Sequence, residues 1–211
     1  MNKLKLNRDN DADRAQLLIT DNDDPAKGTE KLSHLSAREY VQCGHISQEE
    51  FSSYFKFSFV RNPWARLVSE YRYRNYLRHR NFKDFVLNKL PARGWDDKYR
   101  HIMSQTEMLY NESGELLVDF VGKFENLQQD FDQVCKHLGF EDSTLLHVNS
   151  SDKKSRELRR KTRNFLYRNS ESQLRSYKDF YDPETREAVT ELYRADIINF
   201  GYSFDDGVNT S

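Results

Sequence analysis

Apolar residues along the chain alternate between short buried runs and stretches with helical spacing. Residues 55–60 (FKFSFV) are rich in aromatic and β-branched residues and end at Asn62-Pro63, which predicts a strand closed by a turn. Proline suits the first position of a helix, where its missing N–H would be unpaired anyway. Apolar residues then recur every three to four positions, which predicts a helix continuing toward Arg78 with one apolar face: Trp64, Leu67, Val68 and Tyr71.

The same patterns predict the remaining elements. Ser36 and Glu39 have the spacing of a capping box, which favours a short helix ending at Gly44. Gly139 and Gly201 follow two further amphipathic stretches and indicate helix ends there. The full set comprises helices over 36–44, 82–90, 127–138 and 183–199 and a strand over 116–120. Helices alternating with buried strands predict an α/β domain.

Polar residues gather where the first strand meets its helix. Arg61 stands at the carboxyl end of the strand, the edge at which open α/β sheets bind ligands. Arg66, Ser69 and Tyr73 share a second face of the helix. A guanidinium fork, a hydroxyl and the free N–H groups of a helix start suit a phosphate group. The alternative is an ordinary strand–helix turn in which Arg61 pairs with a carboxylate.

The spacing R-N-P-x-x-R-x-x-S-x-Y over residues 61–71 resembles the 3′-phosphate-binding segment of the family-2 carbohydrate sulfotransferases. These enzymes use 3′-phosphoadenosine-5′-phosphosulfate as sulfuryl donor and no metal. The resemblance implies that Arg61 and Ser69 hold the 3′-phosphate of the nucleotide, with Arg66 as a further nucleotide-binding candidate.

Three more segments resemble the family in the right order: Val118–Leu127 (with Lys123 where the family usually has arginine), Leu146–Ser151 and Tyr181–Phe204. Together they imply a P-loop-like parallel sheet flanked by helices, and sulfuryl transfer to a carbohydrate hydroxyl. The family's 5′-phosphosulfate loop is not found. Pro25–Thr29 is superficially similar, but it follows Asp21–Asp24, whose negative charge repels phosphate. We therefore expect the chain to lack the first strand and this loop. The alternative is a degenerate or truncated, non-catalytic member of the family that binds an anionic glycan.

Sulfuryl transfer to a hydroxyl needs a base, and neutral histidine is the usual base near pH 7. His34, in His34-Leu35-Ser36 with Gly44 ten residues on, resembles the segment of the uronyl 2-O-sulfotransferases that carries the proposed base, and His45 is the second candidate. His101 is expected at the surface. Gln105 and Glu107 resemble a segment that lines the acceptor cleft. For each of these residues a purely structural role is the alternative.

Charge is distributed unevenly. The chain as a whole has a formal net charge of −1, which excludes a globally basic nucleic-acid binder. Residues 152–178 nevertheless hold ten Lys and Arg against three Asp and Glu, a local net charge of +7. Arg159 and Arg160 lie in this basic insertion and are candidates for contacting the glycan acceptor. The alternative is a solvated basic face that balances the acidic remainder.

The domain organisation predicted is a flexible acidic segment over 1–30, a sulfotransferase-like domain over 31–205 and a tail over 206–211. No apolar run reaches the roughly 18–20 residues of a membrane span, and residues 1–30 do not read as a signal peptide. Cys43 and Cys135 are expected to be separate reduced thiols. As it stands the chain is therefore expected in the cytoplasm. A membrane-anchored segment preceding it would place it in the Golgi lumen instead. The oligomeric state is not predicted.

Overall fold

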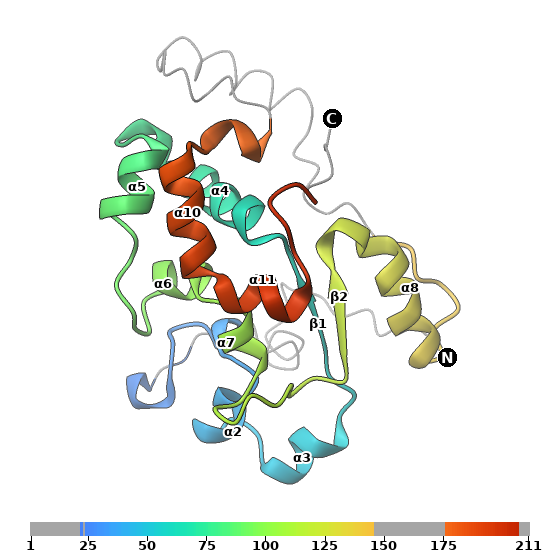
Figure 1. Cartoon of the computed structure of the whole chain (residues 1–211). Helices are drawn as coiled ribbons and strands as arrows, with labels where there is room; N and C mark the ends of the chain where they lie inside the picture. Colours follow the sequence, from blue (N-terminus) through green and yellow to red (C-terminus); the bar gives the residue numbers. More distant parts are fainter. Residues whose placement is uncertain (1–21, 23, 146–175, 207–211) are drawn as a thin grey trace, which may run out of the picture.

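Two short parallel strands lie between layers of helices in this computed structural model, which describes residue 22, residues 24–145 and residues 176–206 (Figure 1). Strand β1 (Phe57–Val60) pairs with β2 (Phe120–Lys123), with Phe57 opposite Phe120 and Val60 opposite Lys123. The mixed α/β architecture predicted from the sequence is thus confirmed, with a two-stranded parallel sheet among the described residues.

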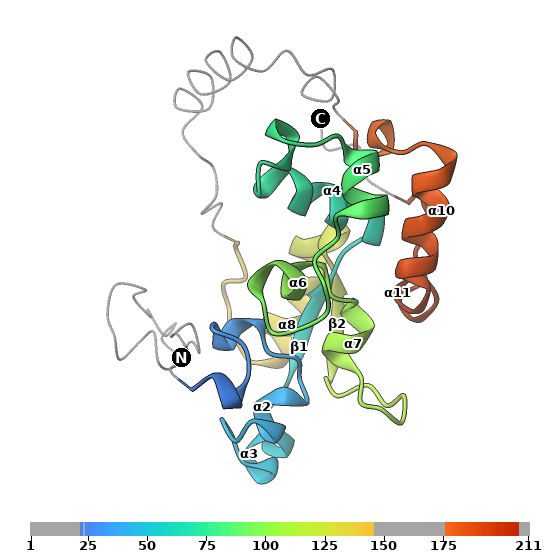
Figure 2. The ribbon, with the colours of Figure 1, turned by 90° about the vertical axis from the view of Figure 1, so that its left-hand side faces the viewer.

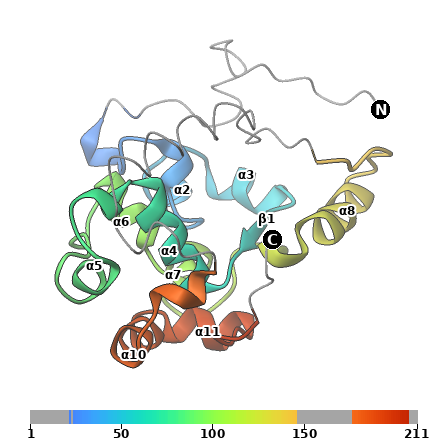
Figure 3. The ribbon, with the colours of Figure 1, turned by 90° about the horizontal axis from the view of Figure 1, so that it is seen from above.

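The helices are distributed unequally around this sheet. Helix α8 lies on one side of the strands, and α4 to α7 lie on the other side with α10 and α11 (Figures 1 and 3). Helices α2 and α3 lie at the amino end of β1, so α4 and the turn before it lie at the opposite, carboxyl end (Figures 1 and 2). The bounds are α2 Glu39–Gln42, α3 Gln48–Ser53, α4 Pro63–Tyr73, α5 Phe82–Asn88, α6 Asp97–Ile102, α7 Gln105–Leu109, α8 Leu127–His137, α10 Pro183–Leu192 and α11 Arg194–Phe200.

The core is built around the apolar face of α4 and is rich in aromatic rings. Trp64, Leu67, Val68 and Tyr71 are all buried, as their helical spacing predicts. Tyr71 has three aromatic neighbours within 6.1 Å, centroid to centroid, contributed by α5 and the segment before α10: Phe82, Phe85 and Phe180. Burying this face leaves the opposite, polar face of α4 available for a site.

Several helix ends differ from the prediction. Helix α4 ends at Tyr73 rather than continuing to Arg78, because Asn75 adopts the left-handed conformation (φ 59°), which an α-helix cannot contain. Helix α5 ends at Asn88, two residues early. Only Glu39–Gln42 of the helix predicted over 36–44 is α-helical. Apolar spacing locates these helices, but local backbone geometry decides where they stop.

Strand β2 begins four residues later and ends three residues later than the strand predicted over 116–120. Leu116 instead forms an isolated antiparallel bridge with Tyr110, and the Asp119 carboxylate accepts the N–H of Lys56 at 2.7 Å. The strand contains Gly122, whose missing side chain leaves room for the Phe59 ring: an added Cβ would lie 2.5 Å from it. Glycine weakens the strand pattern in the sequence, and the apolar residues before it misplace the prediction.

The C-terminal helix predicted over 183–199 is two helices, α10 and α11, that meet at Tyr193. The buried Tyr193 hydroxyl donates to the Ile102 carbonyl at 2.6 Å, and Asp196 on α11 accepts hydrogen bonds from the start of α7. These tertiary interactions orient α11 separately from α10.

The end of the acidic N-terminal segment packs against the domain. Pro25–Lys27 forms a 3₁₀ turn capped by Asp24, and Thr29 is fully buried. Gly28 has φ 112°, and a Cβ there would lie 2.8 Å from Leu35. The basic insertion lies outside the described residues except for 176–178, and the segment Leu146–Ser151 lies wholly outside them. Within the described part, no helix combines the length and apolar character needed to cross a membrane. Cys43 and Cys135 are separate thiols, as predicted, and are not joined by a disulfide.

Glu39 forms a buried ion pair that links α2 to α6. Its carboxylate accepts the N–H of Ser36 at 2.6 Å and pairs with the Arg100 guanidinium. Burial opposes ionisation, but these hydrogen bonds outweigh burial and hold the pKa of Glu39 below its usual value.

Because the folded-state pKa is lowered, the carboxylate stabilises the fold fully above the unfolded-state pKa of about 4.3, and less as pH falls below it. Glu39→Gln is expected to destabilise the protein by about 2 kcal/mol at pH 7, since it removes a hydrogen-bonded charge. Urea unfolding at several pH values measures this. The difference between the two proteins should shrink below about pH 4, and a difference independent of pH would contradict this account.

Candidate active site

The turn between β1 and α4 is held on both sides by buried side chains. The Asn62 side chain caps α4 by accepting the N–H of Ala65 at 3.2 Å, and it donates to the Ser203 carbonyl at 2.9 Å. The Asn62 N–H donates to the carboxylate of Glu125, which also accepts from the Tyr202 hydroxyl. Residues remote in sequence therefore fix the turn at the carboxyl end of both strands.

Arg61 is clamped through its backbone, which leaves its guanidinium for another partner. The Gln105 amide brackets it: the Arg61 N–H donates to Oε1 at 2.7 Å, and Nε2 donates to the Arg61 carbonyl at 2.9 Å. The guanidinium lies over the Phe124 ring, 4.7 Å from its centroid. Among the described residues no carboxylate forms an ion pair with it. Burial lowers the pKa of Arg61 without discharging it.

A cavity of about 300 Å³ opens beside this turn, and the three predicted nucleotide-binding residues line it together. Arg61, Arg66 and Ser69 are joined there by Glu70, Tyr73 and His101. Positions 66, 69, 70 and 73 follow helical spacing along the polar face of α4. The face predicted from the sequence is therefore the face that forms the cavity.

The acidic residue in this cavity, Glu70, pairs with two neighbouring side chains. Burial disfavours the Glu70 carboxylate, but hydrogen bonds from His101 and Arg74 outweigh that cost, and the pKa of Glu70 lies below its usual value. Its Oε2 lies 3.1 Å from His101 Nδ1, and its Oε1 accepts from Arg74 Nε. Glu70 is therefore ionised, and Arg74, which also pairs with Asp97, offsets part of its negative charge.

Arg66 is largely engaged in holding the cavity wall. Its two terminal nitrogens donate to the backbone carbonyls of Met103 and His101, both at 2.8 Å. Arg66 thus positions the segment that carries His101, and its charge remains at the cavity surface. It also lines a second, larger cavity of about 670 Å³ among the aromatic residues of β1 and the α2–α3 region.

His34 does not line the cavity but lies behind the ring of His101, which does. Its ring packs edge-on against His101 with the centroids 4.7 Å apart, and its Nδ1 lies 2.9 Å from an Asp97 carboxylate oxygen. Burial and the neighbouring His101 lower the pKa of His34, although Asp97 opposes this. His101, expected at the surface, has a 30% exposed side chain and lines the cavity, where Arg66 fixes its backbone and Glu70 binds its ring.

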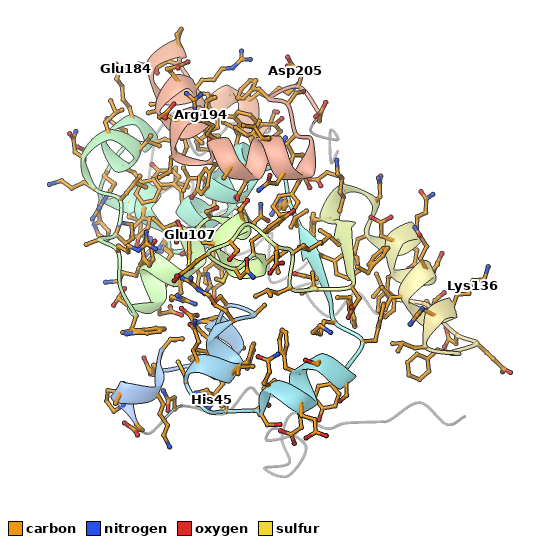
Figure 4. The ribbon with its side chains drawn as sticks, turned by 60° about the horizontal axis from the view of Figure 1, so that its bottom comes forward. His45, Glu107, Lys136, Glu184, Arg194 and Asp205 are labelled. Atoms are coloured by element: carbon orange, nitrogen blue, oxygen red, sulfur yellow. The ribbon has the colours of Figure 1, made fainter. Side chains whose placement is uncertain are left out.

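The other candidates lie outside this cavity. His45 has its Nε2 2.8 Å from the Lys27 carbonyl, at the end of the molecule formed by the N-terminal helices (Figure 4). Glu107 on α7 pairs with Arg93 at 2.9 Å. Gln105 is buried, and its side-chain amide forms hydrogen bonds with the Arg61 backbone and the Asp196 carboxylate. Arg159 and Arg160 lie outside the described residues.

Sequence reasoning missed Glu70, Asp97 and Phe124. Glu70 lies one residue after Ser69 on the helix face already identified, so helical spacing could have found it. Asp97 precedes His101 by one helical turn, which is a visible pairing once α6 is known. Phe124 carries no local signal, because its contact with Arg61 depends on the pairing of β1 with β2.

A guanidinium, a hydroxyl and a helix start lie together at the carboxyl end of parallel strands, a combination that suits an anion in proteins of the α/β class. Comparison with known proteins identifies the class further. The family described as "Sulfotransferase family" matches residues 19–203, and the chain belongs to this family of transferases. An uncharacterized protein of Archaeoglobus fulgidus is 30% identical over 111 residues, which cover 50% of this chain and 85% of that protein. No solved structure matches the chain.

Proposed function

We propose that the chain transfers a sulfuryl group from 3′-phosphoadenosine-5′-phosphosulfate to a carbohydrate hydroxyl. The observation that carries this proposal is the cavity in which Arg61, Arg66 and Ser69 converge on the polar face of α4. The family supports sulfotransfer in general, and the cavity supports a phosphorylated nucleotide as the donor.

The 3′-phosphate of the nucleotide binds beside Arg61. The guanidinium offers a planar fork of donors that matches two phosphate oxygens, and the Ser69 hydroxyl offers a further donor eight residues along. Gln105 and Glu125 hold the backbone of the turn, so the site is organised before the ligand arrives. Preorganisation of this kind lowers the entropy cost of binding.

In the reaction the acceptor hydroxyl oxygen forms a bond to sulfur as the bond between sulfur and the bridging phosphate oxygen breaks. The hydroxyl proton passes to a base, and the products are 3′-phosphoadenosine-5′-phosphate and the sulfated sugar. His34 is the proposed base, because it packs on His101 at the cavity wall, whereas His45 lies away from the cavity.

The larger cavity is the proposed site of the acceptor. It shares Arg66 with the nucleotide cavity, so the two adjoin, and its lining includes the rings of Tyr40, Tyr54 and Phe57. Tyrosine combines an apolar ring face with a hydrogen-bonding hydroxyl, which suits a sugar ring. Desulfated glycans of different backbones, assayed with a radiolabelled sulfuryl donor, test the acceptor class.

His34→Asn is expected to lower kcat by at least a hundredfold while leaving the affinity for 3′-phosphoadenosine-5′-phosphate within twofold, because a base acts on the acceptor proton and not on the nucleotide. Sulfate transfer to the glycan and calorimetric titration of the nucleotide measure the two quantities. His45→Asn is the matched control and should retain activity. Loss of activity in His45→Asn alone would assign the base to His45.

The basic insertion supports a second candidate function, non-catalytic binding of an anionic glycan, because its ten cations are concentrated in 27 residues that include Arg159 and Arg160. Heparin affinity chromatography distinguishes this candidate function from sulfuryl transfer. Retention that survives Arg61→Ala but is lost in the double variant Arg159→Ala/Arg160→Ala, in a chain without transferase activity, would favour glycan binding alone.

A further inference from the structure

Three potential metal ligands meet behind the wall of the nucleotide cavity. His34 ends the turn Leu32–His34, and Asp97 and His101 lie one helical turn apart on α6. Asp97 Oδ1 lies 2.9 Å from His34 Nδ1 and 3.5 Å from His101 Nε2. One donor atom from each residue lies within 4.8 Å of the other two.

The spacing of these atoms suits a small tetrahedral ion. Zinc binds imidazole nitrogen and carboxylate oxygen at about 2.0–2.2 Å, so two ligands of a tetrahedral site lie roughly 3.4 Å apart. The His101–Asp97 separation of 3.5 Å already matches this value, and the His34–Asp97 separation must widen by about half an ångström.

Two of the three potential ligands, His101 and Asp97, have a side-chain partner that orients them, and His34 is held through its backbone. The other ring nitrogen of His101, Nδ1, lies 3.1 Å from Glu70 Oε2, and the other oxygen of Asp97 accepts from Arg74. Arg74 also binds Glu70, so the two carboxylates share one cation. The His34 carbonyl accepts from Arg100 Nε at 2.8 Å. A carboxylate behind a histidine ligand is the usual outer shell of a protein zinc site.

The donor atom of His34 lies close to Asp97 but makes no aligned hydrogen bond within the described part of the chain. His34 Nδ1 is buried, and despite its closeness to Asp97 it has no aligned hydrogen-bond partner among the described residues. A buried polar atom without a partner is uncommon and calls for one. The side chains of the three residues are 23–32% exposed, so an ion can enter and a water molecule can complete its coordination.

We propose that His34 Nδ1, Asp97 Oδ1 and His101 Nε2 bind a divalent transition-metal ion of the Zn²⁺ type, with water in the open position. Two imidazoles and one carboxylate favour zinc or a similar ion over calcium or magnesium, which prefer oxygen ligands alone. The ion would lie beside His101, at the wall of the nucleotide cavity. The site needs neither nucleotide nor acceptor, so it can be tested apart from sulfuryl transfer. A metal on His34 Nδ1 takes the lone pair of the neutral imidazole and leaves Nε2 protonated, so the metal-bound chain would not use His34 as the base.

Titration of the full, tag-free chain with Co²⁺ tests the site, because tetrahedral Co²⁺ with nitrogen and oxygen ligands absorbs visible light far more strongly than the hydrated ion. We expect saturable visible bands with a stoichiometry of one, and displacement by Zn²⁺. His101→Gln, Asp97→Asn and His34→Gln should each weaken Co²⁺ binding at least tenfold. Glu70→Gln, which keeps every ligand but loses the outer carboxylate, should weaken it about tenfold.

His79→Gln is the matched control, because it removes an exposed imidazole and leaves the cluster intact. Far-ultraviolet circular dichroism identifies any variant that fails to fold, and three independent ligand variants keep the test decisive. Absence of the bands in the wild-type chain, or bands that persist in every folded ligand variant, would overturn the proposal. Nucleotide binding is measured separately without metal, so failure of one proposal does not imply failure of the other.

Discussion

Arg61→Ala is expected to weaken binding of 3′-phosphoadenosine-5′-phosphate by at least a hundredfold. The guanidinium lies at the cavity beside Ser69, is not neutralised by a carboxylate ion pair within the described residues, and is steadied by the Phe124 ring. Hydrogen bonds to a charged group contribute about 1.5–3 kcal/mol each, so loss of a bidentate contact between the guanidinium and the phosphate costs about 3–4 kcal/mol of binding free energy. Calorimetric titration of the nucleotide into wild type and variant measures the difference.

One further ligand and two further variants test the specificity of this measurement. Adenosine 5′-monophosphate lacks the 3′-phosphate, so its weaker binding should be the same in wild type and in Arg61→Ala. Arg61→Lys keeps the charge but loses the planar fork, so its affinity for the nucleotide should lie between those of wild type and Arg61→Ala. Arg194→Ala removes an exposed arginine that pairs with Glu191, and should bind as wild type does. Equal nucleotide affinity in wild type and Arg61→Ala would remove the basis for the proposed function.

The part of the site formed by residues that are close together in the sequence could be predicted. A strand, a proline at the helix start and a helix with one apolar face are all local signals, and they place Arg61, Arg66 and Ser69 around one cavity. The helix over 127–138 is found almost to the residue for the same reason, since Gly139 with φ 71° ends it.

The part that depends on remote contacts could not be predicted. Gln105 brackets Arg61 from 44 positions away, and Asp196 reaches the start of α7 across 91 positions. The sequence predicts an exposed His101 but not its contacts with Arg66 and Glu70, which come from a different helix and hold it at the cavity. Spacing along a chain identifies a face of a helix, but only the fold decides which faces meet.

Asp196→Ala is expected to be the most destabilising single change at the site, by about 3–5 kcal/mol. The carboxylate is fully buried and accepts from four groups at the start of α7: the Ser104 hydroxyl at 2.6 Å, the Gln105 N–H at 2.9 Å, the Thr106 N–H at 2.7 Å and the Gln105 side-chain amide at 3.4 Å. Alanine removes this acceptor. The buried Gln105 N–H is then unsatisfied, at a cost of about 1–3 kcal/mol, and the half-buried Ser104 and Thr106 groups lose their hydrogen bonds to a charged acceptor. For a chain of this length the Tm should fall by roughly 10 °C.

The same variant tests whether the fold positions Arg61. Asp196 holds Gln105, and Gln105 holds both backbone groups of Arg61, so the folded fraction of Asp196→Ala should also bind the nucleotide more weakly. Urea unfolding gives the stability, and titration under conditions where the variant remains folded gives the affinity. Asp205→Ala removes an exposed carboxylate from the same C-terminal region and should change stability by less than about 0.5 kcal/mol.

If Asp196→Ala were as stable as Asp205→Ala, the carboxylate would not be anchoring α7. If Asp196→Ala unfolded readily but bound the nucleotide normally while folded, Gln105 would position Arg61 without help from α11.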